Sequence, residues 1–181
     1  MSKILPPIQK ESANEEVREI LSSVEAKFGF IPNLIKVFAS SPATLKAYLT
    51  LGSLLESTLF TAEEQQIILL TVSRENRCEY CMAAHSMIST KMVQMDPEKL
   101  KAIRAGEPVK NDKHRALIDF TENVVNERGY VAESTVKKFI AAGYSDQHVL
   151  EVILGVTMKT LSNYTNHIAQ TPIDPQFSDF S

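Results

Sequence analysis

"TAEEQQIILLTVSRENRCEYCMAAHS", residues 61–86, decides the predicted fold, because a buried helix and a cysteine-bearing segment follow each other directly in it. Thr61 and Glu64 have the spacing of a capping box, which marks the start of a helix. The centre, "IILLTV", is apolar on nearly every side, so this helix is expected to be buried. The two cysteines of the chain, Cys78 and Cys81, come immediately afterwards. Their chemistry is therefore the first question that the sequence raises.

The rest of the chain has the same helical character. Six glycines, eight prolines and almost no alternating polar and apolar runs indicate helices throughout. Ser41 and Pro42 have the residue types of an N-cap and a first helical position, and Gly29 and Gly106 follow helical patterns as C-caps do. We predict one all-α domain of roughly eight helices across residues 1–181, with extended tails at 1–10 and 171–181. The helices are expected within residues 12–29, 30–57 (two helices), 61–77, 78–92, 96–106, 112–129, 132–143 and 145–170.

The composition is that of an ordinary globular protein. Apolar residues make up 44% of the 181 residues and charged residues 23%, and the net charge is −3. Lysine and arginine are spread along the chain, so we expect binding neither to nucleic acid nor to an anionic membrane. No stretch is apolar enough to span a bilayer, and Pro6 and Pro7 interrupt the N-terminal hydrophobic residues, which predicts a cytoplasmic protein. The apolar helices expected at 61–77 and 145–170 predict an oligomer.

The spacing of the cysteines and of His85 suits a redox centre. Each residue of a helix turns by about 100°, so Cys78, Cys81 and His85 fall within an arc of about 60°. A helix N-terminus, a nearby imidazole and a second thiol all favour the thiolate form of a cysteine. The two cysteines are also close enough to form a disulfide. In the cytosol such a pair is more often catalytic or metal-binding than structural.

Two other readings of the same residues stay open. In a zinc site, Cys78, Cys81 and His85 would supply three of four ligands, with His167 or His114 as the fourth. Alternatively, both cysteines are inert core thiols, although their neighbours in sequence are mostly polar or charged. In the redox reading, Cys81 is the helical neighbour of His85 and becomes the sulfenic acid. Cys78, nearer the helix end and expected to be more exposed, then condenses with it.

The pattern C-x-Y-C-x-x-x-H within "SRENRCEYCMAAHS", residues 73–86, resembles the carboxymuconolactone decarboxylase superfamily, in its AhpD-like alkylhydroperoxidase branch. The similarity is to the members labelled peroxidase-related proteins. It extends over residues 28–55 upstream and 144–174 downstream, and so over nearly the whole chain.

The resemblance implies an all-helical AhpD-like fold, assembled into trimers or hexamers, and a thiol-dependent reduction of organic hydroperoxides. It implies that Cys81 is the peroxidatic cysteine, Cys78 the resolving cysteine and His85 the proton-relay histidine. It further implies re-reduction by a dithiol donor, such as a lipoyl-bearing or thioredoxin-like protein, and no bound cofactor.

The sequence departs from the family pattern at two positions. The relay of the family often begins with a glutamate where this chain has Gln66, and glutamine cannot take up a proton. Glu63 and Glu75 are the carboxylates that could replace it. Tyr80 stands where the best-studied AhpD enzymes carry a histidine, and its phenol could donate to a sulfur or to a bound peroxide.

His167 lies in the polar cluster "NYTNHIA" of an otherwise apolar helix. It could line the same pocket as His85, together with Asn163 and Tyr164. The alternative is that these polar residues mark an exposed helix end or a hydrogen-bond network between subunits.

The leading functional hypothesis is an antioxidant thiol peroxidase that acts on organic hydroperoxides through a disulfide between Cys81 and Cys78. The alternatives are a dithiol–disulfide oxidoreductase and a redox-sensing oligomer, each with little peroxidase turnover. A decarboxylase-type lyase is less favoured, because that reaction does not need a pair of cysteines. Turnover with a supplied dithiol would distinguish an enzyme from a sensor, which is oxidised once and then changes its size or its binding.

Overall fold

All regular elements in residues 4–181, the part that the computed structural model describes, are helices. The all-α class is confirmed, and eight of the α-helices have nine residues or more. Residues 1–3 of the predicted N-terminal tail lie outside the described residues. The elements are η1 (Lys10–Ser12), α1 (Glu15–Phe28), α2 (Asn33–Phe38), α3 (Pro42–Glu56), α4 (Ala62–Glu75), α5 (Glu79–Lys91), α6 (Pro97–Ala105), α7 (Asp112–Asn126), α8 (Glu133–Ala141), α9 (Asp146–Ala169) and η2 (Pro175–Phe180).

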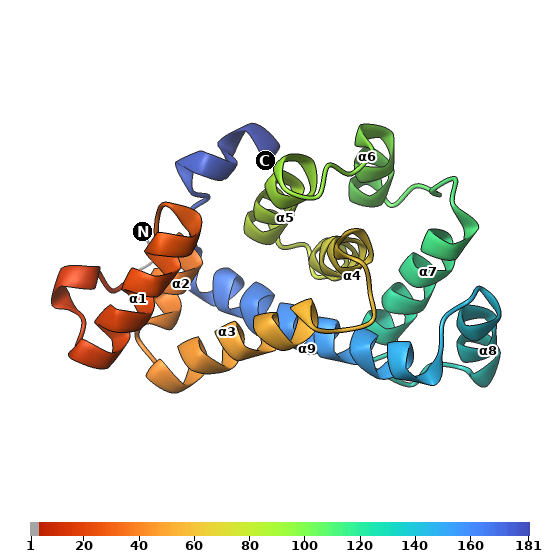
Figure 1. Cartoon of the computed structure of the whole chain (residues 1–181), viewed down its shortest axis with the longest axis horizontal. Helices are drawn as coiled ribbons and strands as arrows, with labels where there is room; N and C mark the ends of the chain where they lie inside the picture. Colours follow the sequence, from red (N-terminus) through yellow and green to blue (C-terminus); the bar gives the residue numbers. More distant parts are fainter. Residues whose placement is uncertain (1–3) are drawn as a thin grey trace.

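Helix α4 lies at the centre of the molecule, as the sequence predicts. It packs against α5, α7 and α9, and Figure 1 shows these helices arranged around it. The side chains of Ile67, Ile68 and Leu70 are completely buried. Thr61 and Glu64 form the predicted capping box, in which each side chain hydrogen-bonds to the backbone of the other residue.

The predicted helix ends are confirmed at several positions. Ser41 accepts a hydrogen bond from the backbone N–H of Thr44, and Pro42 is the first residue of α3. Gly29 and Gly106 end α1 and α6 in the left-handed conformation, with φ of 78° and 72°. Local sequence signals are therefore sufficient to place these elements.

The C-terminal tail differs from the prediction of an extended segment at 171–181. Residues Pro175–Phe180 form the 3₁₀ helix η2, which packs against α5. Phe177 is buried against Phe30 and Tyr80 in edge-to-face contacts. Arg104 of α6 donates a hydrogen bond to the carbonyl of Phe180. The tail thus covers the helix that begins at the cysteines, and burial of its aromatic side chain explains why it does not stay extended.

Gly155 lets α9 approach α4 closely. A methyl group at this position would lie 2.7 Å from Cγ2 of the buried Ile68. We expect Gly155→Ala to lower the free energy of unfolding by about 1–3 kcal/mol, because Ile68 or α9 must shift. Gly52→Ala in α3 is the matched control, because its new methyl group would meet only Cε of Met158, at 3.5 Å. Urea unfolding of both variants checks this, and equal midpoints would contradict the close crossing.

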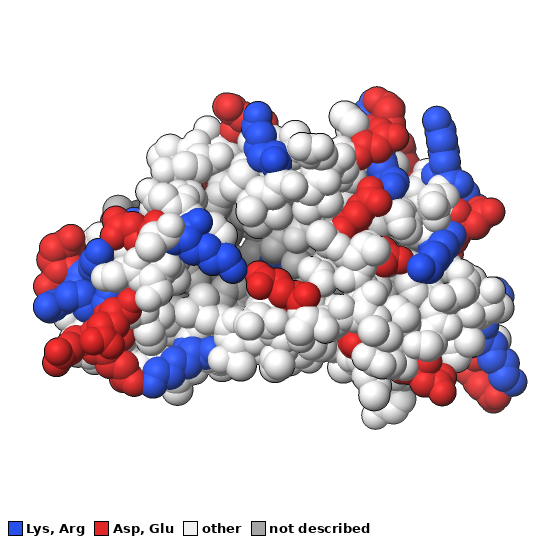
Figure 2. Space-filling view, in the orientation of Figure 1, with Lys and Arg blue, Asp and Glu red and all other residues white. Residues whose placement is uncertain are grey.

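Charges of both signs are mixed over the face in Figure 2, which shows no continuous basic surface there. No helix within residues 4–181 combines the length and the apolar character needed to cross a membrane. Helix α9 nevertheless exposes a row of large apolar side chains, a pattern typical of a contact surface. This row consists of Leu150, Ile153, Tyr164 and Ile168.

Candidate functional site

The two cysteines lie at the N-terminus of α5. Cys78 is the N-cap residue, and Cys81 follows within the first turn. The turn from α4 to α5 passes through Arg77, which has a φ of 55°, and the N–H of Cys78 donates to the carbonyl of Ser73. Both thiols are free, with exposures of 1% for Cys78 and 2% for Cys81. The prediction that Cys78 is the more exposed thiol is therefore wrong, because α9 covers both.

Helix α9 supplies the polar groups that face the thiols. The amide Nδ2 of Asn166 donates to Sγ of Cys81 at 3.3 Å and to Sγ of Cys78 at 3.8 Å. Sγ of Cys81 lies 3.9 Å from Oγ of Ser162. Lys159 is one turn before Ser162 on the same face and is completely buried. Its ammonium makes no hydrogen bond within residues 4–181.

The surroundings of the two thiols move their pKa values in opposite directions. The pKa of Cys81 lies well below its ordinary value, because the Cys78 thiol donates a hydrogen bond to it and the Lys159 charge and Ser162 also stabilise the thiolate. The pKa of Cys78 is raised, because its proton is held in the hydrogen bond to Cys81 and the group is buried. The surroundings therefore favour the thiolate form at Cys81 and the protonated form at Cys78.

Gln66 and His85 are brought together by the packing of α4 against α5. Nδ1 of His85 lies 2.9 Å from Oε1 of Gln66, and since a carbonyl oxygen can only accept, Nδ1 carries the hydrogen. The pKa of His85 lies well below its ordinary value because of burial and the nearby charge of Lys159. His85 is thus neutral, with a free lone pair on Nε2. It makes no hydrogen bond to either sulfur among the described residues.

The phenol of Tyr80 has a different role from the predicted one. Its hydroxyl donates to Oδ2 of Asp174 at 2.5 Å and accepts the backbone N–H of Leu34 at 3.3 Å. Burial and the neighbouring Asp174 raise the pKa of this phenol. Tyr80 therefore does not donate to a sulfur, and it joins α5 to the C-terminal segment instead.

The two carboxylates predicted as substitutes for the relay glutamate are paired with other groups. Glu63 pairs with Lys99 at 2.7 Å, and Glu75 is held by Arg74 and Asn126. Neither carboxylate replaces the relay glutamate in this arrangement.

His167 is exposed, and its ring stacks on that of Tyr164, so it does not line a pocket with His85. Within residues 4–181, no three His, Cys, Asp or Glu side chains gather as the ligands of a metal ion would.

Sequence reasoning missed four residues near the thiols: Tyr48, Lys159, Ser162 and Asn166. Tyr48 comes from α3, and its pKa is raised by burial and by the two cysteines, against a hydrogen bond with Ser162. The other three have the spacing i, i+3 and i+7 on α9. Polar residues at that spacing lie on one face of a helix. A polar face on a mostly apolar helix is the sequence feature that could have identified them as neighbours of the site.

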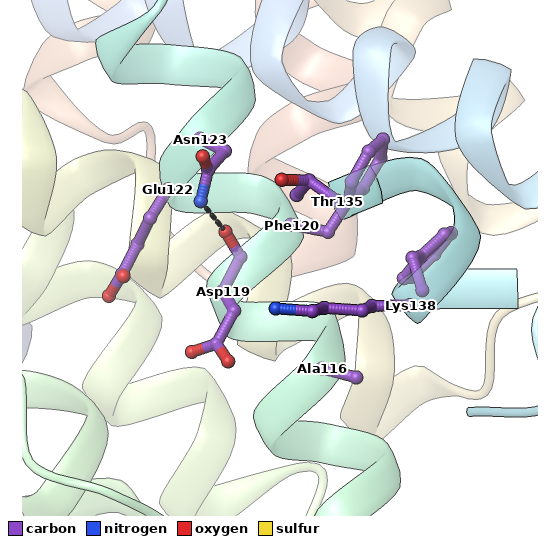
Figure 3. Close-up of a pocket in the computed structure, with 8 residues that line it drawn as sticks. Ala116, Asp119, Phe120, Glu122, Asn123, Thr135 and Lys138 are labelled. Atoms are coloured by element: carbon purple, nitrogen blue, oxygen red, sulfur yellow. Dashed lines mark hydrogen bonds between the residues drawn. The ribbon is translucent and has the colours of Figure 1, made fainter. Parts of the chain in front are cut away.

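A hollow of about 260 Å³ lies between α7 and α8, away from the cysteines (Figure 3). Asp119, Glu122 and Lys138 contribute charged groups to it. It contains no cysteine or histidine, and Asn123 in its wall donates to the backbone carbonyl of Asp119. The hollow therefore offers no nucleophile of the kind found at the start of α5.

No family model and no curated protein matches the chain. Solved structures do. One is the alkylhydroperoxidase AhpD core of a peroxidase-related protein from Ralstonia eutropha JMP134, with 21% identity, a TM-score of 0.86, and coverage of 96% of this chain and 93% of that one. The chain has the AhpD-like fold. The resemblance that the cysteine motif predicts is thereby confirmed for the fold.

Two further structures share the AhpD-like fold. A peroxidase-related protein from Silicibacter sp. TM1040 has 18% identity and a TM-score of 0.82, with 96% of this chain and 91% of that one covered. The debrominase Bmp8, in a cysteine-to-alanine variant bound to 2,3,4-tribromopyrrole, has 18% identity and a TM-score of 0.84, with 99% and 96% covered.

Proposed function

We propose that this protein is a dithiol peroxidase that reduces organic hydroperoxides. One observation carries the proposal: Cys81 and Cys78 lie together under Asn166, and the surroundings hold the first as a thiolate and the second as a thiol. A two-step reduction needs this arrangement, because one sulfur attacks the peroxide and the other attacks the resulting sulfenic acid. The similarity in fold to peroxidase-related proteins supports the same assignment.

In the first step, the Cys81 thiolate attacks an oxygen of the peroxide. The S–O bond forms, the O–O bond breaks, and the alkoxide leaves with the electron pair and takes up a proton to become the alcohol. In the second step, Cys78 attacks the Cys81 sulfenic acid. The disulfide forms, and the Cys78 proton leaves with hydroxide as water. We assign proton transfer to neutral His85, which Gln66 holds in one tautomer.

A thiol count tests the proposal. One equivalent of cumene hydroperoxide per chain is added to the reduced protein, and free thiols are measured before and afterwards. We expect both thiols to disappear rapidly and a dithiol to restore them. If both thiols survive the peroxide but exchange readily with a disulfide compound, the dithiol–disulfide oxidoreductase becomes the better account.

The similarity to the debrominase favours reductive dehalogenation as a second candidate. The same pair of thiols could carry it out: bromine passes from the organic bromide to the Cys81 sulfur, the ring carbon takes up a proton, and Cys78 displaces bromide as the disulfide forms. Thiol loss with tribromopyrrole, accompanied by bromide release, would support this candidate. Thiol loss with the hydroperoxide alone would exclude it for that substrate.

We also propose that the protein works in the cytoplasm as a homo-oligomer, a trimer or hexamer, and is re-reduced by a lipoyl-bearing or thioredoxin-like protein. The exposed apolar row on α9 supports self-association, because such a surface is costly in water. Light scattering of the purified protein checks the assembly: a monomeric mass at micromolar concentration would contradict it.

A further inference from the structure

Lys159 is the buried charged group that the proposed chemistry leaves without a role. Its side chain has 0% exposure, yet none of the ion pairs within residues 4–181 includes it. Burying an ammonium without a partner costs several kcal/mol, and a methionine or leucine would fill the same space at lower cost. Fold stability alone therefore does not explain a lysine at this position.

The surroundings of Lys159 contain one group that can become its counter-ion. The titratable groups around Lys159 and the thiols come from two helices: the Lys159 charge acts on Cys78, Cys81 and His85 of α5, and Tyr48 of α3 responds to the two cysteines. Tyr48 and Cys78 keep their protons, and neutral His85 carries no charge. The Cys81 sulfur is therefore the group that can supply a counter-ion to the buried ammonium.

We propose that Lys159 is the positioning residue that keeps Cys81 ionised, with the thiolate and the ammonium forming a buried pair between α5 and α9. The register of α9 supports this pairing, because Ser162 and Asn166, one and two turns further on, both contact Cys81. The pair also explains how the site works with Gln66 instead of a relay glutamate. A nearby cation stabilises the thiolate without a carboxylate that removes its proton.

The pair has a redox consequence that rests on the proposed disulfide chemistry. When Cys81 and Cys78 form a disulfide, two electrons leave the sulfurs for the oxidant, and the anion opposite Lys159 disappears. The ammonium then remains buried without a counter-ion. Lys159 therefore stabilises the dithiol relative to the disulfide, which makes re-reduction by a dithiol donor more favourable.

The test measures the ionisation of Cys81 and uses no peroxide. The rate of alkylation by iodoacetamide is followed against pH for the reduced wild type and for Lys159→Met, Lys159→Gln and Lys159→Arg. We expect the midpoint of the rate profile to move to higher pH in K159M and K159Q and the rate at pH 7 to fall about tenfold or more, because a Cys81 thiol that returns to an ordinary pKa is mostly protonated at that pH. K159R keeps the cation and is expected to retain most of the rate. Lys137→Met, at an exposed ion pair with Glu133, is the matched control.

A second readout separates this role from a structural one. K159M should keep or raise the melting temperature, because an apolar side chain replaces a costly buried charge and Cys81 can then take up a proton, while its equilibrium with glutathione shifts toward the disulfide. If K159M does not fold, K159Q carries the comparison. An unchanged pH profile in either folded variant would overturn the proposal. Because no peroxide is used, a wild type without peroxidase activity would refute the proposed function and leave this result intact.

Discussion

Cys81→Ser is expected to abolish hydroperoxide reduction, with a loss on the order of 10³-fold or more in the rate of peroxide consumption. A serine hydroxyl at neutral pH is not ionised, and neither the Lys159 charge nor the Asn166 amide can make it a nucleophile comparable to a thiolate. Peroxide consumption in the presence of a dithiol checks this, because turnover depends on regenerating the same sulfur.

Cys78→Ser is the matched variant, and it should fail at a different step. Cys81 still reacts once with peroxide, but no thiol is present to resolve the sulfenic acid, so turnover stops and dimedone traps the product. The first reaction should also be slower than in the wild type, since the hydrogen bond from the Cys78 thiol helps to lower the pKa of Cys81. If dimedone instead labels residue 78 in Cys81→Ser, the assignment of the two cysteines must be reversed.

Asp174→Ala is expected to lower the free energy of unfolding by about 2–4 kcal/mol. The carboxylate is buried, accepts the hydroxyl of Tyr80, and accepts the backbone N–H of Asn33 at the start of α2. Removing it leaves the buried Tyr80 hydroxyl and the partly buried N–H of Asn33 without this acceptor, and α2 loses a negative charge near its N-terminus.

Urea unfolding measures this loss, with Asp179→Ala as the control. Asp179 lies in η2, which Asp174 directly precedes, but it is exposed, so its removal should change stability by a few tenths of a kcal/mol. A loss for Asp174→Ala no larger than that of the control would contradict the role of the carboxylate. Iodoacetamide should also reach Cys78 and Cys81 faster in Asp174→Ala, because the segment that covers α5 is no longer held in place.

The sequence predicts features that depend on residues close together in the chain, and it misses those that depend on contacts between distant segments. Helix ends depend on neighbours three or four residues apart, and Thr61 with Glu64, Ser41 and Gly29 mark them correctly. The cysteines are found in the same way, because their spacing within one helix is local.

Contacts across the chain were not predictable in this way. Asn166 reaches Cys81 over 85 positions, and Asp174 reaches Tyr80 over 94. The face of α9 that meets the thiols depends on how α9 packs against α4, where Gly155 lies close to Ile68. No local sequence pattern encodes this packing. Tyr80 was misassigned for the same reason, because its partner lies in a segment that was expected to be extended.

Because the chain is synthesised from its N-terminus, the position of Lys159 in α9 determines when Cys81 acquires this partner. Cys78 and Cys81 leave the ribosome well before α9, which carries Lys159, Ser162 and Asn166. Until α9 docks, Cys81 lacks the charge of Lys159 and the hydrogen bonds of Ser162 and Asn166, which favour its thiolate. The thiolate of Cys81 therefore gains its full set of stabilising partners only when the last long helix packs against the start of α5.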